Sequence, residues 1–109
     1  MRRGEVWWAE IPPPYGSRPV VILTRNQVLQ NIASVVVAGV TSTVRDLPTE
    51  VSLGRQQGLK RTCVANMDSI LTLPRSRLKY VMGACDVAKL AEIDEAIRIS
   101  LGLIDTGGA

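Results

Sequence analysis

Histidine and phenylalanine are absent from this sequence of 109 residues, and only two cysteines occur. Without His, the chain cannot supply a Ser–His–Asp triad, a Cys–His dyad or a His general acid–base pair. Cys63 and Cys85 lack the CxxC spacing of a zinc site, so we expect two reduced and buried thiols. Any catalysis by this chain must use Arg, Lys, Tyr, carboxylates, hydroxyls or backbone donors.

Long apolar runs and the common cofactor motifs are missing as well. No apolar run approaches the length that spans a bilayer, and the charged N-terminus has no apolar segment behind it. The expected compartment is therefore the cytoplasm. The sequence contains no GxxxxGK[ST], GxGxxG or GxSxG motif and no paired metal-ligand carboxylates, so we expect no cofactor and no metal.

The composition is that of one small globular domain, which we predict to span residues 1–109. A hydrophobic fraction of 46% and a mean hydropathy of +0.14 indicate an ordered chain. The net charge of +3 and the pI near 9.2 permit a polyanionic partner without requiring one.

Short β-prone segments, bounded by Gly, Pro and polar residues, fill the chain up to residue 85. Alternation in the first segment places Trp7 and Trp8 on opposite faces, so one Trp should be in the core and the other partly exposed. Gly39, inside a continuously apolar segment, predicts a bulge or a close backbone approach. Residues 25–31 are expected to form a short helical turn or a loop, and residues 74–78 one helical turn. The predicted strands are 4–11, 18–24, 34–43, 49–53, 62–66, 69–73 and 79–85.

After residue 85 the apolar period changes to three and four residues, which predicts an amphipathic helix over 86–105. Asp86 suits the N-cap, and Gly107–Gly108 should end the helix. Its expected apolar face comprises Val87, Leu90, Ile93, Ile97, Leu101 and Ile104. The predicted fold class is mainly β, a small barrel or curled sheet of about five to seven strands closed by this helix.

Cations and hydroxyls gather at two predicted strand ends. Arg18 opens the second strand, and Thr41, Ser42 and Thr43 close the third. If these strands are antiparallel neighbours, Arg18 and Thr41 share one rim of the sheet. A guanidinium fork with a nearby hydroxyl suits a phosphodiester. Spacing alone, however, favours a solvated loop arginine and an ordinary strand end.

Two further features could serve RNA binding, although each also has an ordinary structural explanation. A partly exposed Trp8, with Tyr15, offers a face for an unstacked base, although a subunit interface would use an exposed Trp equally well. The remaining loop cations are either solvated surface or a field that steers phosphates. They are Arg45, Arg55, Lys60, Arg61, Arg75, Arg77 and Lys79.

The order of the segments is more informative than any one of them. It runs RGEVWWAEIPPPYGS–RPVVILTRN, VVVAGVTST, PTEV, GL…TCV, DSILTLPRSRL and a final helix. From about residue 2 to 105 it resembles the MazF/PemK family of toxins from bacterial type II toxin–antitoxin systems. The resemblance implies an SH3-like (CcdB/PemK-type) barrel, a homodimer and a MazE-like cognate antitoxin as partner.

The resemblance also implies an activity, namely metal-independent, sequence-specific cleavage of single-stranded mRNA. The ribose 2′-hydroxyl attacks, leaving a 2′,3′-cyclic phosphate and a 5′-hydroxyl. By position, Arg18 matches the catalytic arginine, a general acid and phosphate stabiliser, and Thr41 matches the catalytic threonine. The residues implied to contact RNA are Trp8, Gly16, Ser17, Ser42, Thr43, Asp68 and Ser69.

The sequence departs from the family pattern in three places. No residues separate Ser17 from Arg18, where many relatives carry a longer loop that borders the RNA groove. Asp68–Leu71 replaces a segment that commonly supplies a base-reading amide and a cation. Ile11 stands where an exposed aromatic is common. The recognised RNA sequence therefore does not transfer from relatives.

Two alternatives remain beside an RNA-cleaving toxin. A CcdB-like gyrase poison shares the fold, but that group ends in Trp-Gly-Ile, whereas this chain ends in Asp-Thr-Gly-Gly-Ala. A catalytically inactive relative that binds RNA or a partner is the other alternative.

Overall fold

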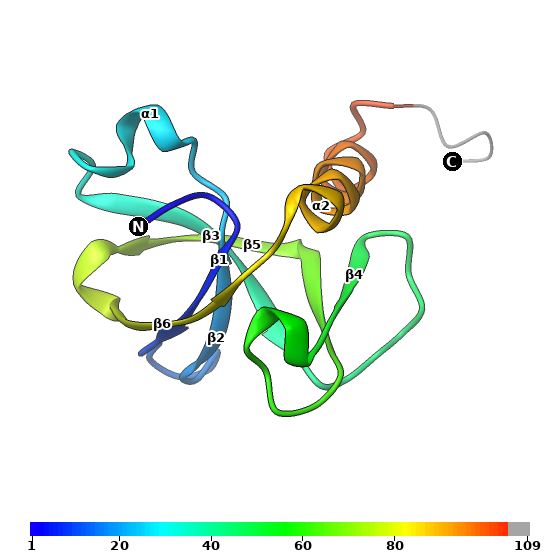
Figure 1. The fold of residues 1–109 in the computed structure, drawn as a ribbon, viewed down its shortest axis with the longest axis horizontal. Helices are drawn as coiled ribbons and strands as arrows, with labels where there is room; N and C mark the ends of the chain where they lie inside the picture. The colour runs from blue at the N-terminus through cyan, green and yellow to red at the C-terminus, as the bar shows by residue number, and fades with distance from the viewer. Residues whose placement is uncertain (105–109) are drawn as a thin grey trace.

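Six strands form one antiparallel sheet in the computed structural model, which describes residues 1–104 (Figure 1). The strand order is β4-β5-β3-β2-β1-β6, and every neighbouring pair is antiparallel. The strands are β1 (Glu5–Ala9), β2 (Arg18–Ile22), β3 (Ser34–Thr41), β4 (Glu50–Leu53), β5 (Cys63–Pro74) and β6 (Leu78–Ala84). The helices are α1 (Asn26–Leu29), α2 (Val87–Ser100) and the 3₁₀ turns η1 (Arg55–Gln57) and η2 (Arg75–Arg77). The predicted mainly β fold with a C-terminal helix is confirmed.

The sheet curls until the turn η1, beside β4, contacts the opposite edge strand β6 (Figure 1). This closure depends on two glycines whose backbones pack directly together. A Cβ atom on Gly83 would lie 2.2 Å from the Gln57 carbonyl oxygen, and one on Gly58 would lie 2.0 Å from the Met82 carbonyl oxygen. Only residues without a Cβ allow this approach.

Both faces of the sheet are covered, because successive residues of the central strands enter different hydrophobic clusters. Val21 belongs to the cluster under α2, which Ile93 and Ala96 of that helix complete. Val20 and Ile22 belong to the second cluster, which Leu29 of α1 helps to close. The expectation that the third strand is covered on both faces is met from Val37 to Val40, whereas Val36 is exposed.

One strand prediction was wrong, because the two segments 62–66 and 69–73 form the single strand β5. The two predicted strands left out Met67 and Asp68, whose backbone N–H groups both have partners in the structure. The Met67 N–H donates to the Thr49 carbonyl, and the Asp68 N–H donates to Asn66 Oδ1. The strand therefore bends here without ending.

Helix α2 begins as predicted, with the Asp86 side chain accepting a hydrogen bond from the Lys89 N–H. It ends at Ser100, earlier than predicted. Gly102 has φ +70°, and the Leu103 N–H bonds the Arg98 carbonyl, which is a Schellman stop. The predicted stop at Gly107–Gly108 lies outside the described residues.

The apolar face of α2 is also shorter than predicted. Leu90, Ile93 and Ile97 contact the core, whereas Val87 and Leu101 are exposed. Both Trp side chains are half-buried: Trp8 is partly exposed as predicted for one of the two, whereas Trp7 packs against the second hydrophobic cluster without being fully buried. Cys85 is buried as expected, but Cys63 is only partly buried.

Candidate active site

Arg18 and Thr41 lie opposite each other on neighbouring strands. β2 pairs with β3 so that Val20 faces Gly39, and continuing this register by two residues places Arg18 opposite Thr41. The two residues contribute to the linings of two adjoining pockets, of about 200 Å³ and about 550 Å³. We call these the small pocket and the large pocket. The expectation that both residues share one rim of the sheet is therefore met.

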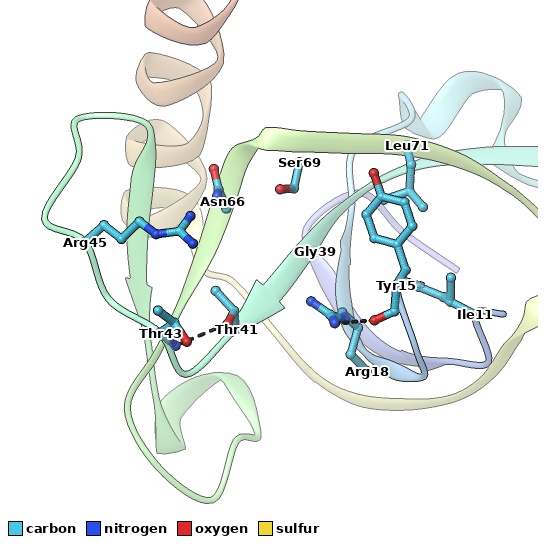
Figure 2. Close-up of a pocket in the computed structure, with 10 residues that line it drawn as sticks. All are labelled: Ile11, Tyr15, Arg18, Gly39, Thr41, Thr43, Arg45, Asn66, Ser69 and Leu71. Carbon is cyan, nitrogen blue, oxygen red and sulfur yellow. Dashed lines mark hydrogen bonds between the residues drawn. The ribbon is translucent and has the colours of Figure 1, made fainter. Parts of the chain in front are cut away.

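The loop immediately before β2 holds the Arg18 side chain. Arg18 Nε donates to the Gly16 carbonyl at 3.4 Å, and its Nη2 donates to the Tyr15 carbonyl (Figure 2). Gly16 has φ +79°, a conformation that favours glycine, and it turns both carbonyls toward the guanidinium. A guanidinium has five N–H donors, so others remain for a ligand.

Thr41 is oriented at the other side of the rim. Its Oγ1 accepts a hydrogen bond of 3.1 Å from the Thr43 N–H (Figure 2). Because the hydroxyl oxygen is engaged as an acceptor, its proton is available for an outside acceptor. A bulge in the β3–β5 pairing, between Ala38 and Val40, precedes Thr41, as Gly39 predicted.

The small pocket is lined by hydrogen-bond donors and contains no carboxylate. Arg18 and Arg45 lie at its two sides, with Asn66 and Ser69 between them and Thr43 close to Arg45 (Figure 2). Among residues 1–104, neither arginine forms an ion pair with a carboxylate. The small pocket therefore suits an anion. Its full lining is Ile11, Tyr15, Arg18, Gly39, Thr41, Thr43, Arg45, Asn66, Ser69 and Leu71.

The large pocket lies on the other side of Arg18 and Thr41 and combines aromatic rings with cations. Trp8 and Tyr80 face each other across β1 and β6, with ring centroids 6.4 Å apart and an interplanar angle of 65°. Lys60 and Arg61 lie in the lining, which again lacks a carboxylate. Aromatic faces beside cations are typical of surfaces that bind single-stranded nucleic acid.

The structure brings most of the predicted site residues to these two pockets. Trp8, Ser17 and Ser42 line the large pocket, whereas Thr43 and Ser69 line the small one. The predicted RNA contacts themselves are not tested by this placement. Gly16 lines neither pocket and contributes through its carbonyl to Arg18.

Asp68 is not brought to either pocket. Its Oδ2 accepts a hydrogen bond of 2.7 Å from Thr49, and its Oδ1 lies 2.8 Å from the Ser100 hydroxyl of α2. The carboxylate therefore ties the bend of β5 to the end of the helix. Its placement gives no support to the predicted contact with RNA.

Asn66 is the pocket residue that the sequence reasoning missed. The available signal was an amide in the otherwise apolar stretch Cys-Val-Ala-Asn-Met, on a strand with covered faces. Tyr80 of the large pocket was missed as well, and β6 gives no alternating signal around it, because Lys79, Tyr80 and Val81 are all exposed.

The buried cysteine has no part in either pocket. Burial raises the pKa of the Cys85 thiol from 9.0 to about 11, so it stays protonated and unreactive at neutral pH. Within residues 1–104, no group of three or more Cys, Asp or Glu side chains is arranged to hold a metal ion. No helix in this range is long and apolar enough to cross a membrane.

A sequence comparison matches residues 2–101 to the family described as PemK-like, MazF-like toxin of type II toxin–antitoxin system. A curated relative from Mycobacterium tuberculosis, named probable endoribonuclease MazF2, is 40% identical over 103 residues, which cover 94% of this chain and 99% of the relative. The endoribonuclease MazF of Staphylococcus epidermidis is 33% identical, with 94% of this chain and 92% of the relative covered.

Solved structures show the same architecture. The Mycobacterium tuberculosis toxin MazF-mt6 superposes with a TM-score of 0.86 at 32% identity, covering 93% of this chain and 99% of the other. An endoribonuclease from a mycobacterial species, solved in complex with its cognate antitoxin, gives a TM-score of 0.82 at 30% identity, covering 96% and 98%.

Proposed function

The chain belongs to the PemK-like, MazF-like family of toxins from type II toxin–antitoxin systems, and we propose from this premise that it cleaves single-stranded mRNA at specific sequences. Relatives that share 33–40% of its residues over most of its length are named endoribonucleases, and this chain is a MazF-type endoribonuclease toxin. Its proposed place of action is the cytoplasm, where mRNA is found.

The observation that carries the proposal is the pair Arg18 and Thr41, at the junction of two pockets without carboxylates. In the proposed reaction the ribose 2′-hydroxyl loses its proton to water as its oxygen forms a bond to phosphorus. The bond from phosphorus to the 5′-oxygen breaks, and that oxygen leaves as a hydroxyl with a proton from Arg18, the proposed general acid, which regains a proton from water. Negative charge grows on the phosphoryl oxygens in the transition state. The Arg18 guanidinium and the Thr41 hydroxyl stabilise that charge, which is an effective way to accelerate the step without His.

The two pockets account for how an RNA strand would lie. With the scissile phosphate between Arg18 and Thr41, the nucleotides on its two sides occupy different pockets. Trp8, in the large pocket, offers a ring for one unstacked base, and Lys60 and Arg61 attract the adjoining phosphates. The shared rim thus holds the phosphate while each pocket holds a base.

Two protein partners complete the proposal. The similarity to an endoribonuclease solved with its cognate antitoxin supports a cognate antitoxin for this chain. An acidic antitoxin segment would complement the cationic pockets and block access of RNA. We further propose a homodimer, as the resemblance implies, and a sedimentation experiment that finds only monomer at micromolar concentration would contradict it.

The test of the proposed activity uses the purified protein and a long single-stranded RNA, with and without excess EDTA. We expect cleavage at defined positions, with product ends that carry a 2′,3′-cyclic phosphate and a 5′-hydroxyl. Intact RNA in the presence of folded protein would refute the activity, and cleavage that stops in EDTA would refute the metal-independent mechanism.

The test of the site replaces each proposed catalytic residue separately. We expect Arg18→Ala and Thr41→Val to lower the cleavage rate by about 100-fold or more, since each removes a donor to the transition-state charge. Arg98→Ala, on the exposed face of α2, is the control with an unchanged rate. If either variant cleaves as fast as the unmodified protein, that residue has been misassigned.

A further inference from the structure

Asn66 is a polar side chain that is almost completely buried in the wall of the small pocket. Its exposed fraction is 8%, and it lies on β5 beside Ser69, between the two arginines of the pocket (Figure 2). An amide in such a position is costly unless its donors and acceptor find partners. The amide groups that lack a protein partner therefore indicate which groups of a ligand the pocket can bind.

The bend in β5 determines how this amide is oriented. In the β3–β5 pairing, Ala38 faces Ile70 and Val40 faces Ala65, so residues 66–69 lie opposite Gly39 alone. The Asp68 N–H has left the ladder and donates to Asn66 Oδ1 at 2.8 Å. Because a backbone N–H can only donate, the oxygen of the amide is identified without ambiguity.

The other end of the amide lacks a protein partner. No hydrogen bond joins Asn66 Nδ2 to an acceptor within residues 1–104, and the one buried side-chain oxygen or nitrogen without a partner in this range is Glu50 Oε2. Asn66 Nδ2 is thus open to the space of the small pocket. Its two N–H donors are the part of the side chain that a ligand meets.

We propose that Asn66 is a specificity-determining residue, which donates to the keto oxygen of one base next to the scissile phosphate and so favours uracil or guanine at that position. This inference rests on the proposed ribonuclease function. A neutral amide attracts phosphate far less than Arg18 or Arg45 does, so its contribution is to distinguish bases.

The direction of the preference follows from the orientation of the amide. Asn commonly recognises adenine with one donor and one acceptor together. Here the amide oxygen of Asn66 already accepts a hydrogen bond from the Asp68 N–H, so only the Nδ2 donors remain for a base. A base that presents an exocyclic amino group would place its own N–H donor against these donors. Adenine and cytosine present such groups at the positions where guanine and uracil carry oxygen. A buried donor left without an acceptor costs binding free energy, so the protein should discriminate against RNA with adenine or cytosine at this position.

The first measurement maps the cleavage of a randomised single-stranded RNA library in EDTA. We expect one position next to the cut to contain uracil or guanine about 10-fold more often than adenine or cytosine. An absence of any such keto preference in cleaved RNA would overturn the inference. An absence of cleavage would instead refute the proposed function, so the two failures are distinct.

The second measurement combines a protein change with a base change. The keto oxygen is deleted from the preferred base, with 2-aminopurine replacing guanine or pyrimidin-2-one replacing uracil. The unmodified protein should cleave the altered RNA about 10-fold more slowly. Asn66→Ser should cleave both RNAs at rates within about threefold of each other. A purely structural role of Asn66 would slow both RNAs equally and keep the 10-fold ratio, which would overturn the inference.

A matched control and two safeguards complete the design. Asn31→Ser, at an exposed position outside the pockets, should keep the full ratio. If Asn66→Ser folds but does not cleave, the same ratio is measured as binding of RNA with a 2′-deoxy nucleotide at the cut. If it does not fold, Asn66→Asp, which keeps an oxygen for the Asp68 N–H, is measured in its place.

Discussion

At the scale of single residues, the position of Arg18 is determined by the few residues that precede it. Its guanidinium bonds the carbonyls of Tyr15 and Gly16, both within three residues of it in the chain. Only Ser17 separates Arg18 from Gly16, so the carbonyls of the preceding loop lie within reach of the guanidinium. This loop thus holds the proposed catalytic residue in place.

Gly16→Ala tests this arrangement. The φ of +79° strains any residue with a Cβ, so the loop should shift, and with it the carbonyls that hold Arg18. We expect an RNA cleavage rate about 10-fold lower, with a melting temperature lower by only about 4–8 °C. Gly54→Ala is the control, since Gly54 has φ −160° and equally open surroundings. An unchanged cleavage rate in Gly16→Ala would show that the carbonyls do not position Arg18.

At the scale of elements, the curl of the sheet depends on the contact between η1 and β6. Gly83→Ala should open it, because a Cβ there would lie 2.2 Å from the Gln57 carbonyl oxygen, and backbone cannot move aside as a side chain can. We expect a loss of about 2–4 kcal/mol and a melting temperature lower by about 10–20 °C, measured by thermal unfolding.

Gly39→Ala provides the comparison for Gly83. Gly39 also lies within the sheet, but its nearest neighbours are 3.9 Å from the position of an added Cβ. The melting temperature of the Gly39→Ala variant should stay within about 4 °C of that of the unmodified protein. Equal destabilisation of the two variants would mean that any Cβ added within the sheet, and not the contact with η1, is responsible.

The elements themselves were largely predictable, and the exceptions depend on contacts that only the assembled fold provides. Strand periodicity, breakers and the Asp86 cap located β1 to β4, β6 and the start of α2, because these signals act over a few residues. The continuity of β5 was not predictable, since it depends on partners of Asn66 and Met67 that are themselves placed by the fold. The exposure of Val87 likewise depends on where the helix crosses the sheet.

Part of the site was predictable, because it lies on two strands that are neighbours in the sequence. The antiparallel pairing of two consecutive strands brings Arg18 and Thr41 together, and consecutive strands usually pair. Asn66 and Tyr80 come from strands distant in the chain, whose register only the assembled sheet defines. Asp68 was placed near RNA by resemblance, whereas the bend directs its carboxylate to Thr49 and Ser100.

At the scale of the whole molecule, four cations surround the two pockets, and RNA affinity should depend on salt accordingly. Binding to single strands weakens with a slope of about −0.7 per neutralised phosphate, so raising salt from 50 to 200 mM should weaken binding roughly 50-fold. The four cations are Arg18, Arg45, Lys60 and Arg61.

The paired substitution of Lys60 and Arg61 by Ala should reduce this salt effect to about sevenfold, measured by fluorescence anisotropy with a 2′-deoxy analogue of the RNA. The control is the paired substitution of Lys89 and Arg98 on α2, which removes the same charge from residues engaged with Glu92 and Glu95. Equal changes in the two double variants would show that net charge, and not the large pocket, governs affinity.

The lack of carboxylates in both pocket linings has a practical consequence at the bench. Inorganic phosphate, sulfate and heparin carry the charge that these pockets suit, so we expect them to compete with the proposed RNA substrate for Arg18 and its neighbours. If they do, a phosphate buffer or an ammonium sulfate step will mask part of the proposed activity, and a high-salt wash will help to remove host nucleic acid from preparations. Heparin affinity is for the same reason a natural purification step, and the buffer of choice for kinetics is one without a polyvalent anion.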